Sequence, residues 1–414
     1  MTNTDRANSE VVARITSAEP YLIDLVPAGD VVADLGPRDL LHAGPPLSGW
    51  DEAKQVGALR GSILGSIVHL GWAADLIEAE AAAESGEILL RSANDCGGGG
   101  TYAGVIAATT PVLVVENRTA GIRAFAAINE GRGKALRYGA NDAQTLERLA
   151  WIEGEFADVL GAAIRRSGGI DLREILIQAL HMGDDGHSRQ KAASALILSG
   201  IAPHMAACGR ATAAIERALG FMAGNDIFFL PLTIGLAKST MSAAAGVVGA
   251  SVLTCMSANG IRFGIKISAF GDRWFTTPVP QVTGKFFEGF GIDDANQVIG
   301  DSEISETMGL GAFAMAGAPA LAAYVGGTLE EATRLALEMY DITLAEHPHF
   351  TTPQLNYRGT PTGVDVRKVI ERNLTPLFNT GIAHKSPGIG QIGAGFVRTP
   401  LPCYEAAVAA LAEG

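Results

Sequence analysis

Hydrophobic and polar positions follow two periods along this chain, and they divide its first third into strands and helices. Strands are predicted in EILLRSAND (87–95) and TPVLVVEN (110–117), where apolar residues run continuously between turn residues. Helices are predicted in residues 73–86 and 142–169, where apolar residues recur every three or four positions and each segment ends at glycine. Residues 1–150 therefore predict an N-terminal α/β domain that contains a Gly-rich loop.

From Asp171 to about Asn259 nearly every segment has helical spacing, and the low-charge run 239–260 favours a buried core helix. Strand patterns return at Ile261, in GIRFGIKISAF and later in TPLFNTGIAHK and AGFVRT, with a helix predicted to begin near Glu303. The sequence predicts a mixed α/β (α+β) fold, with a helical domain over 151–259 and a C-terminal α/β domain over 260–414.

Composition and charge narrow the class of protein. The formal net charge is −13, which makes nucleic acid a poor partner because its binding needs a basic face. Only 18% of the residues are charged, and so apolar a surface favours burial in a homo-oligomer or a larger complex. Four separated cysteines without a C-x-x-C pair argue against a zinc–cysteine site or disulfides and favour a reducing cytoplasm. The N-terminus shows no apolar signal core, and we expect no membrane span.

The stretch ALHMGDDGHSRQKA, residues 179–192, gathers side chains able to carry chemistry. A histidine with a carboxylate partner can transfer a proton near neutral pH, and His181 precedes Asp184 at a spacing that fits one helical face. Two alternatives stay open: a polar corner whose aspartates cap the next helix after a turn at Gly183 and Gly186, or a metal site lacking an identifiable third ligand. The candidate catalytic residues here are His181, Asp184, Asp185, His187 and Arg189.

Two other segments are candidate anion sites. In NDCGGGGTYAG (94–104), successive glycine N–H groups can line a concavity for phosphate or carboxylate, although the P-loop pattern is absent. The basic segment that follows it contains Arg118, Arg123, Arg132, Lys134 and Arg137. In RGTPTGVDVRKVIERN (358–373), a turn leads into a helix, and Thr362 and Asp365 have the spacing of a capping arrangement. A tight turn and a well-capped helix are the structural alternatives. The candidate anion-binding residues are Gly97, Gly98, Gly99, Gly100, Arg358, Gly359, Thr360, Thr362 and Gly363, with Arg367 nearby.

NTGIAHKSPGIGQIGAG (379–395) contains G-x-G-x-x-G, but no helix follows because Pro400 and Pro402 interrupt the next segment, so dinucleotide binding is rejected. His384 and Lys385 end an apolar strand, a usual position for site residues.

Three polar pairs give weaker signals. Asp272 and Arg273 are predicted to form an ion pair that fixes a loop, and Asn225 and Asp226 to cap a helix. Two acidic residues, at 303 and 306, favour the dipole of a first helical turn without any function.

Taken together, six ordered motifs resemble a bacterial family encoded beside FdrA-type proteins, whose members are similar to one subunit of the oxamate carbamoyltransferase of anaerobic allantoin breakdown. These motifs are MGDDGHSR, GNDIFFL, NGIRFGIKISAFGDRWF, IGDSEISETMGLGAFAMAGAPA, YRGTPTGVDVRKV and NTGIAHKSPGIGQIGAG. The family's motif residues fall here on the catalytic candidates above, on Asn225, Asp226, Asp272, Arg273, Trp274, Asp301, Glu306, Arg358 and Asp365, and on His384 and Lys385. Asp185, Gly186, Ser188, Gln190 and Pro231 depart from the family pattern, so the acceptor stays open.

The resemblance implies a cytoplasmic subunit that transfers a carbamoyl group between carbamoyl phosphate and a small amide-bearing acid, with FdrA-type partners and no cofactor or metal. Under this hypothesis Arg358 with residues 359–363, or the loop 97–100, holds the phosphate, and His181 or His187 polarises the carbonyl. His384 and Lys385 are candidate oxyanion donors. The alternatives are a metal-assisted amide or ring hydrolase and a non-catalytic scaffold subunit.

Overall fold

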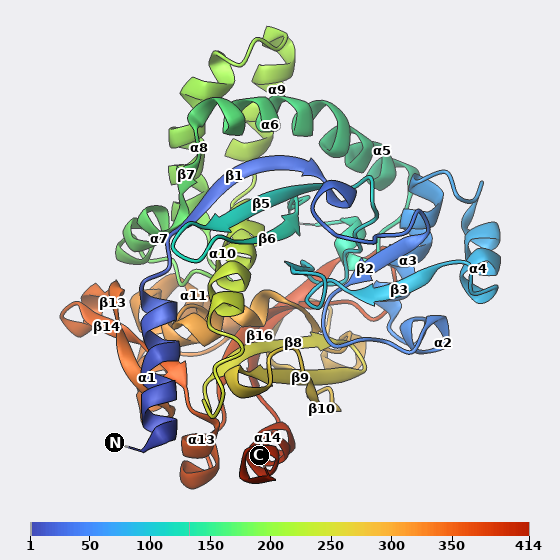
Figure 1. The fold of residues 1–414 in the computed structure, drawn as a ribbon. Helices are drawn as coiled ribbons and strands as arrows, with labels where there is room; N and C mark the ends of the chain where they lie inside the picture. Colours follow the sequence, from blue (N-terminus) through green and yellow to red (C-terminus); the bar gives the residue numbers. More distant parts are fainter. Residues whose placement is uncertain (1, 132, 414) are drawn as a thin grey trace.

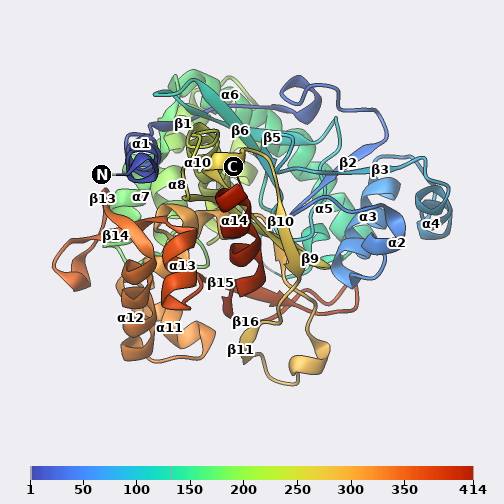
Figure 2. The ribbon, with the colours of Figure 1, turned by 60° about the horizontal axis from the view of Figure 1, so that its bottom comes forward.

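Figures 1 and 2 show the computed structural model, which describes residues 2–131 and 133–413. The α-helices are α1 (Asn3–Thr16), α2 (Trp50–Ala53), α3 (Gly57–His69), α4 (Leu76–Glu84), α5 (Ala143–Trp151), α6 (Ala157–Ser167), α7 (Leu172–His181), α8 (Lys191–Ala206), α9 (Thr212–Ala223), α10 (Leu230–Ala243), α11 (Pro319–Val325), α12 (Leu329–Glu338), α13 (Val366–Arg372) and α14 (Leu401–Glu413). The strands are β1 (Pro20–Pro27), β2 (Asp39–His42), β3 (Leu89–Ser92), β4 (Gly98–Gly99), β5 (Pro111–Asn117), β6 (Ile122–Ala127), β7 (Ile170–Asp171), β8 (Leu253–Asn259), β9 (Arg262–Ile267), β10 (Phe275–Pro278), β11 (Thr283–Phe286), β12 (Ile299–Gly300), β13 (Thr343–Thr352), β14 (Arg358–Val364), β15 (Leu377–Ala383) and β16 (Gln391–Arg398). Helices and sheets are mixed along the chain, which confirms the predicted α/β class.

The largest sheet has the strand order β4-β6-β5-β1-β7. Its pairs are antiparallel except for the parallel pair of β4 and β6. Helix α6 covers one face of this sheet and α10 the other (Figure 1). Since both faces are covered, β5 is apolar over most of its length, with Val112, Leu113, Val114 and Val115 all buried.

Helix α10 lies between this sheet and a short 3₁₀ helix, η6 (Ser302–Met308). The predicted core helix over 239–260 is only partly confirmed, because α10 ends at Ala243 and β8 begins at Leu253. Gly246 and Gly249 have φ of +80° and +77°, and these left-handed turns end the helix and redirect the chain. The prediction of helix as far as Asn259 is therefore wrong.

The C-terminal part contains the antiparallel sheets β10-β9-β8-β12 and β11-β16-β15 and the hairpin β13–β14. Figure 2 shows α1 beside this hairpin. Strands β15 and β16 form a hairpin through Gly388 and Gly390 (φ +89° and +98°). Strand β16, and not a helix, follows these glycines directly. This agrees with the rejection of a dinucleotide-binding motif, which needs a helix at this position.

Three main hydrophobic clusters fill the interior. One joins β1 and β5 to helices α6–α10, a second lies within residues 253–410, and a third surrounds α3. Among residues 2–131 and 133–413, no helix has the length and apolarity needed to cross a bilayer.

Candidate active site

The loop between α7 and α8, residues 182–190, turns where the sequence predicts a break. Gly183 and Gly186 have φ of +93° and +79°, a conformation that glycine adopts without strain. Because α7 ends at His181, the predicted helical pairing of this histidine with the following aspartates is wrong. His181 is exposed instead, and its Nε2 lies 2.8 Å from the Thr351 hydroxyl of β13.

Asp185 is fully buried and holds this loop together. Its Oδ1 accepts hydrogen bonds from the backbone N–H groups of His187 (3.0 Å) and Arg189 (2.8 Å). Its Oδ2 accepts one from the amide of Asn379 on β15 (2.8 Å), and its carbonyl accepts one from the N–H of Gly311 (2.6 Å). The loop is thus fixed both to itself and to the C-terminal part.

Asp184 accepts a hydrogen bond from the first turn of the next helix, α8. Its Oδ2 accepts a hydrogen bond from the N–H of Ala193 in the first turn of α8 (2.9 Å), and its Oδ1 lies 3.1 Å from the guanidinium of Arg189. Burial raises the pKa of Asp184 to about 7, against the opposing effect of these two partners. The predicted capping of the next helix is thus confirmed for Asp184 alone, although the N-cap position itself is Gln190, whose side chain forms no capping hydrogen bond within the described chain.

His187 and Glu306 form a buried pair. The Nδ1 of His187 lies 2.9 Å from Oε1 of Glu306, and both side chains are at most 4% exposed. Burial alone would lower the pKa of His187, but Glu306 and other nearby carboxylates raise it to about 9. The same Oε1 accepts a hydrogen bond from the N–H of Ala312 (3.1 Å), which stabilises the ionised carboxylate. This arrangement favours an imidazolium with Nδ1 held by Glu306.

Glu303 lies one turn before Glu306 in η6 and is fully buried. Neither of its carboxyl oxygens has a hydrogen-bond partner within the described part of the chain. Burial raises its pKa to about 8, although the charge of His187 opposes the shift. At neutral pH this group is therefore mostly a neutral acid beside a charged pair.

His187 lines a cavity with about 520 Å³ of empty space, a volume that includes space open to solvent. Its described lining consists mainly of hydroxyl and amide groups and two basic groups, with no carboxylate: Thr101, Tyr102, Arg137, Tyr138, His187, Ser188, Ile227, Leu230, Ser302, Tyr324, Thr380, Gly381 and Gln391. These residues come from eight separate parts of the sequence. Such a lining favours a small anion.

His384 and Lys385 do not line this cavity. His384 accepts a hydrogen bond from the N–H of Ser386 at Nδ1 (2.8 Å), and its Nε2 lies 3.9 Å from Asp294. Lys385 is exposed and donates to the carbonyl of Asp293. Both side chains fasten the β15–β16 turn to the loop before β12.

Arg358 and residues 359–363 form strand β14, which corrects the predicted turn at this position. Arg358 is exposed, pairs with Glu346 at 2.8 Å and stacks 3.6 Å from the ring centroid of Tyr340. Gly359, Thr360, Thr362 and Gly363 are buried along this strand. The hydrogen-bonding and packing of β14 occupy this segment, and it does not reach the cavity.

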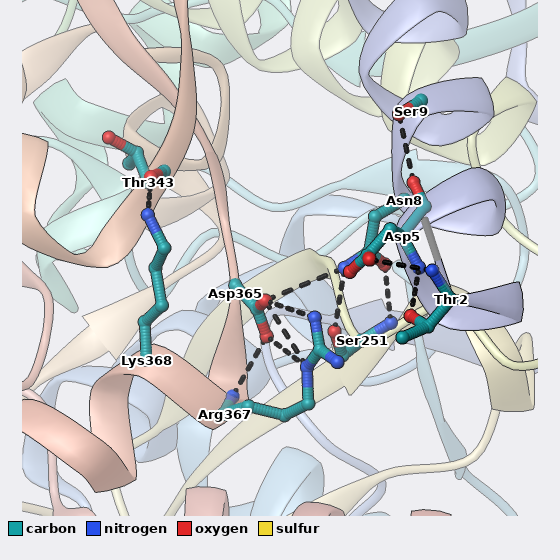
Figure 3. Close-up of polar contacts among 9 residues, drawn as sticks. All are labelled: Thr2, Asp5, Asn8, Ser9, Ser251, Thr343, Asp365, Arg367 and Lys368. Atoms are coloured by element: carbon teal, nitrogen blue, oxygen red, sulfur yellow. Dashed lines mark hydrogen bonds and ion pairs between the residues drawn. The ribbon is translucent and has the colours of Figure 1, made fainter.

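Asp365, and not Thr362, is the N-cap of α13, so the predicted capping arrangement is wrong by three residues. Figure 3 shows its carboxylate between the guanidinium of Arg367, at 2.7 Å, and the amide of Asn8, at 3.5 Å. Arg367 is thereby paired internally rather than presented to an anion.

In the glycine loop 97–100, Gly100 binds a carboxylate of the protein itself, whereas the N–H groups of Gly97 and Gly98 donate to the backbone carbonyls of Asn94 and Ala93. Gly98 and Gly99 form β4, and the N–H of Gly100 donates to Oδ2 of Asp301 (2.7 Å). The N–H of Gly44 (3.0 Å) and the Ser257 hydroxyl (2.5 Å) donate to Oδ1 of Asp301. The loop was predicted to bind an anion. At Gly100 the anion is the carboxylate of Asp301 and not that of a ligand.

Asn225 and Asp226 lie in turns before α10 and do not cap it as predicted, because the N-cap is Phe229 and no described side chain caps the helix. The amide of Asn225 donates to the carbonyl of Asn129 (3.0 Å), and its oxygen accepts from the N–H of Ile227 (3.3 Å). Asp226 is exposed and lies 3.6 Å from Lys191. Asn225 thus joins the helical segment to the loop after β6, next to the cavity residue Ile227.

The predicted ion pair of Asp272 with Arg273 is absent among the described contacts. Asp272 lies 3.4 Å from Lys266 instead, and Arg273 is placed over the rings of Phe270 and Phe275. Neither side chain lines the cavity.

The reasoning from residues alone missed Glu303, Glu306 and the cavity residue Gln391 as site members. Thr101 and Arg137 had been noted only as part of the candidate anion-binding loop 94–104 and of the basic segment after it, and not as partners of His187. The expectation that the two glutamates only favour a helix dipole is wrong, since both are fully buried. One signal was present: they precede the apolar run MGLGAFAMAG, where an acid has little access to water. In the described residues, no three His, Cys, Asp or Glu side chains are grouped to hold a metal ion.

A histidine that lines a cavity and is held from behind by a buried carboxylate is an arrangement common in proteins that act on small polar molecules. The chain matches the model of the family "Oxamate carbamoyltransferase subunit AllG" over residues 88–302. It is 41% identical over 415 residues to the oxamate carbamoyltransferase subunit AllG of Escherichia coli (strain K12), covering 100% of this chain and 98% of that relative. The chain therefore belongs to the AllG family, which confirms the resemblance carried by the six motifs.

Two further proteins are similar to this chain over nearly its whole length. The uncharacterized protein YahG of the same E. coli strain is 40% identical over 402 residues, covering 97% of this chain and 84% of YahG. A crystal structure of a conserved protein of unknown function from Enterococcus faecalis V583 superposes with a TM-score of 0.96 at 38% identity. That match covers 99% of this chain and 98% of the other.

Proposed function

We propose that this chain is a subunit of a cytoplasmic carbamoyltransferase that acts on carbamoyl phosphate and a small amide-bearing acid such as oxamate, in purine and allantoin nitrogen catabolism. The observation that carries the proposal is the identity of 41% to an oxamate carbamoyltransferase subunit over the whole chain. The cavity beside His187 supports it, because its two basic residues and many hydroxyl groups suit a small anionic substrate. We further propose that FdrA-type subunits and other copies of this chain complete the enzyme.

In the proposed reaction, the acceptor nitrogen attacks the carbonyl carbon of carbamoyl phosphate and the carbon–oxygen bond to phosphate breaks. The proton lost by the nitrogen leaves with the phosphate. His187, whose pKa is raised to about 9, would donate a hydrogen bond from Nε2 to the developing oxyanion. Glu306 would orient the ring through Nδ1. No part of this scheme uses a metal or a redox cofactor.

The test measures acceptor-dependent phosphate release from labelled carbamoyl phosphate, in the complex reconstituted with partner subunits and a panel of amides and ureas. We expect His187→Gln to lower the rate by roughly 10²–10³-fold, as the loss of one oxyanion donor does in other enzymes. His204→Gln, on the solvent side of α8, is the matched control and should leave the rate unchanged.

Two outcomes would contradict the proposal. Full activity of the complex with His187→Gln would favour a non-catalytic scaffold subunit. Stoichiometric metal in the purified protein, together with activity lost to a chelator, would favour a metal-assisted hydrolase.

A further inference from the structure

Arg137 is an arginine that the fold buries without a counter-ion. It is 4% exposed, and no carboxylate of the described residues lies within 4.0 Å of its guanidinium. Its one hydrogen bond from the guanidinium goes from Nη2 to the carbonyl of Gly131, and its Nε has no partner within residues 2–131 and 133–413. Burying a charge without a partner is costly, so such a group is usually completed by a ligand.

Thr101 adds a second incomplete group at the same place. It is 7% exposed, and its hydroxyl has no hydrogen-bond partner in the described chain. Thr101 and Arg137 both line the cavity of His187, and both also line a neighbouring cavity beside α3. They are the two described residues that these cavities share, so they form the wall between them.

The charges on the two sides of this wall decide which side an anion would occupy. The cavity beside α3 is lined by Glu130 and Glu153, the second of which pairs with His69 at 2.7 Å. The cavity of His187 has no described carboxylate in its lining. An anion held by Arg137 is therefore favoured on the side of His187.

The surrounding structure holds Arg137 in place before any ligand arrives. It lies in a short 3₁₀ turn, η2 (Leu136–Tyr138), whose N–H groups at Leu136 and Arg137 donate to the two oxygens of Glu130 at 2.8 and 3.0 Å. The guanidinium carbon lies 4.2 Å from the ring centroid of Tyr138. A guanidinium fixed by stacking loses little entropy when it binds an oxyanion.

We propose that Arg137 and Thr101 form an oxyanion-binding subsite, which holds the carboxylate of the acceptor or the phosphate of the carbamoyl donor opposite His187. The guanidinium and the threonine hydroxyl donate hydrogen bonds to the oxyanion, and His187 lines the same cavity. This inference rests on the proposed function for its ligand class. It adds which residues recognise the charged end of the substrate.

The experiment titrates the full-length chain, alone and in the reconstituted complex, with oxamate and separately with inorganic phosphate in a calorimeter. We expect Arg137→Lys to weaken binding of at least one probe by roughly 10–100-fold, because a charge-assisted hydrogen bond and the flat fork of the guanidinium are lost. Thr101→Val should weaken the same probe by roughly 3–10-fold and keeps the site's shape if the arginine variant fails to fold. Arg123→Gln, an exposed arginine paired with Glu116, is the control.

Each outcome of the titrations either assigns the subsite to a ligand or contradicts the inference. Weakening of oxamate alone assigns the subsite to the acceptor carboxylate, weakening of phosphate alone assigns it to the donor, and weakening of both supports a shared subsite. Unchanged affinity in folded Arg137→Lys and Thr101→Val, or no saturable binding of either probe by wild-type protein at millimolar concentration, overturns the inference. Binding does not require turnover, so Arg137-dependent binding without carbamoyl transfer would remove only the proposed reaction.

Discussion

Three ionisable side chains from two distant segments meet beside the cavity. His187 carries a proton that Glu306 stabilises at 2.9 Å, while Glu303, without a partner among the described groups, stays mostly protonated. Burial also raises the pKa of Glu306, but the charge and hydrogen bond of His187 oppose that shift, whereas Glu303 stays mostly neutral. The cost of burying Glu303 is met by protonation rather than by a hydrogen bond.

This predicts a pH-dependent effect of Glu303→Gln on stability. The folded pKa of about 8 lies above the ordinary 4.5, so the group's contribution is fully present below about pH 4.5 and is lost as the pH rises through 8. Glutamine is neutral throughout. We expect the variant to match wild type near pH 4.5 and to be more stable by roughly 2–4 kcal/mol above pH 8. Urea unfolding across this range measures the difference.

Glu288→Gln, an exposed glutamate, is the control and should show no such trend. Parallel pH profiles for wild type and Glu303→Gln would mean that the carboxyl is ionised in the fold.

Local residue roles were predictable where partners are close in sequence. The turn at Gly183 and Gly186 and the hydrogen bond from the first turn of α8 to Asp184 involve residues fewer than ten positions apart. The pairing of His187 with Glu306 spans 119 positions, and no periodicity or spacing predicts it. Only the family resemblance had marked Glu306 as a motif residue; the position of this acid in a helical turn had been given no function.

Among the secondary-structure elements, α1 depends on contacts with distant loops. Its buried Asn8 donates to the Ser251 hydroxyl (2.9 Å), accepts from the N–H of Ser251 (2.8 Å) and contacts Asp365 (Figure 3). One amide side chain thus joins α1 to the chain before β8 and to the N-cap of α13.

Removing this amide should destabilise the protein. Asn8→Ala leaves the buried N–H of Ser251 without its partner and weakens the contacts of Asp365, and we expect a loss of roughly 2–4 kcal/mol. Ser9→Ala, one position away and exposed, should change stability by less than about 0.5 kcal/mol. Thermal denaturation of both variants checks this; equal melting temperatures would show that α1 is anchored elsewhere.

Long elements with a clear period were predicted well, and short or fully buried ones were not. Helices α5 to α9 and strands β5 and β15 follow their sequence patterns. Strand β8 was missed because every residue of it is buried, which removes the alternation that marks a strand. Strand β14 was read as a turn because Gly359, Pro361 and Gly363 are typical turn residues; its pairing with β13 overrides that preference.

At the scale of the whole molecule, α3 joins the N-terminal and C-terminal parts. A Cβ atom at Gly61 would lie 2.3 Å from the carbonyl of Gly139, which ends η2, and 2.9 Å from Pro387 in the β15–β16 turn. This close approach needs a glycine, and it sets the position of the turn that carries Arg137.

The substitution Gly61→Ala therefore tests whether the loss of stability from overpacking exceeds the gain from higher helix propensity. Alanine favours a helix by roughly 0.5–1 kcal/mol, but here we expect a net loss of about 1–3 kcal/mol from overpacking. Gly220→Ala in α9, where a Cβ meets nothing within 4 Å, should stabilise the protein by about 0.5–1 kcal/mol. Denaturant titration compares the two. Stabilisation by both substitutions would show that α3 has room to shift.

The sequence by itself determined the α/β class, most of the helices and strands, the turn of the loop 182–190 and the family, because these depend on nearest neighbours or on ordered motifs. Tertiary structure alone decided which polar residues meet. It brought His187, Thr101 and Arg137 to one cavity, and it directed His181, Lys385 and Arg358 elsewhere. The physical reason is that charge pairing and burial depend on separation in space, and the three hydrophobic clusters set that separation through contacts far apart in the chain.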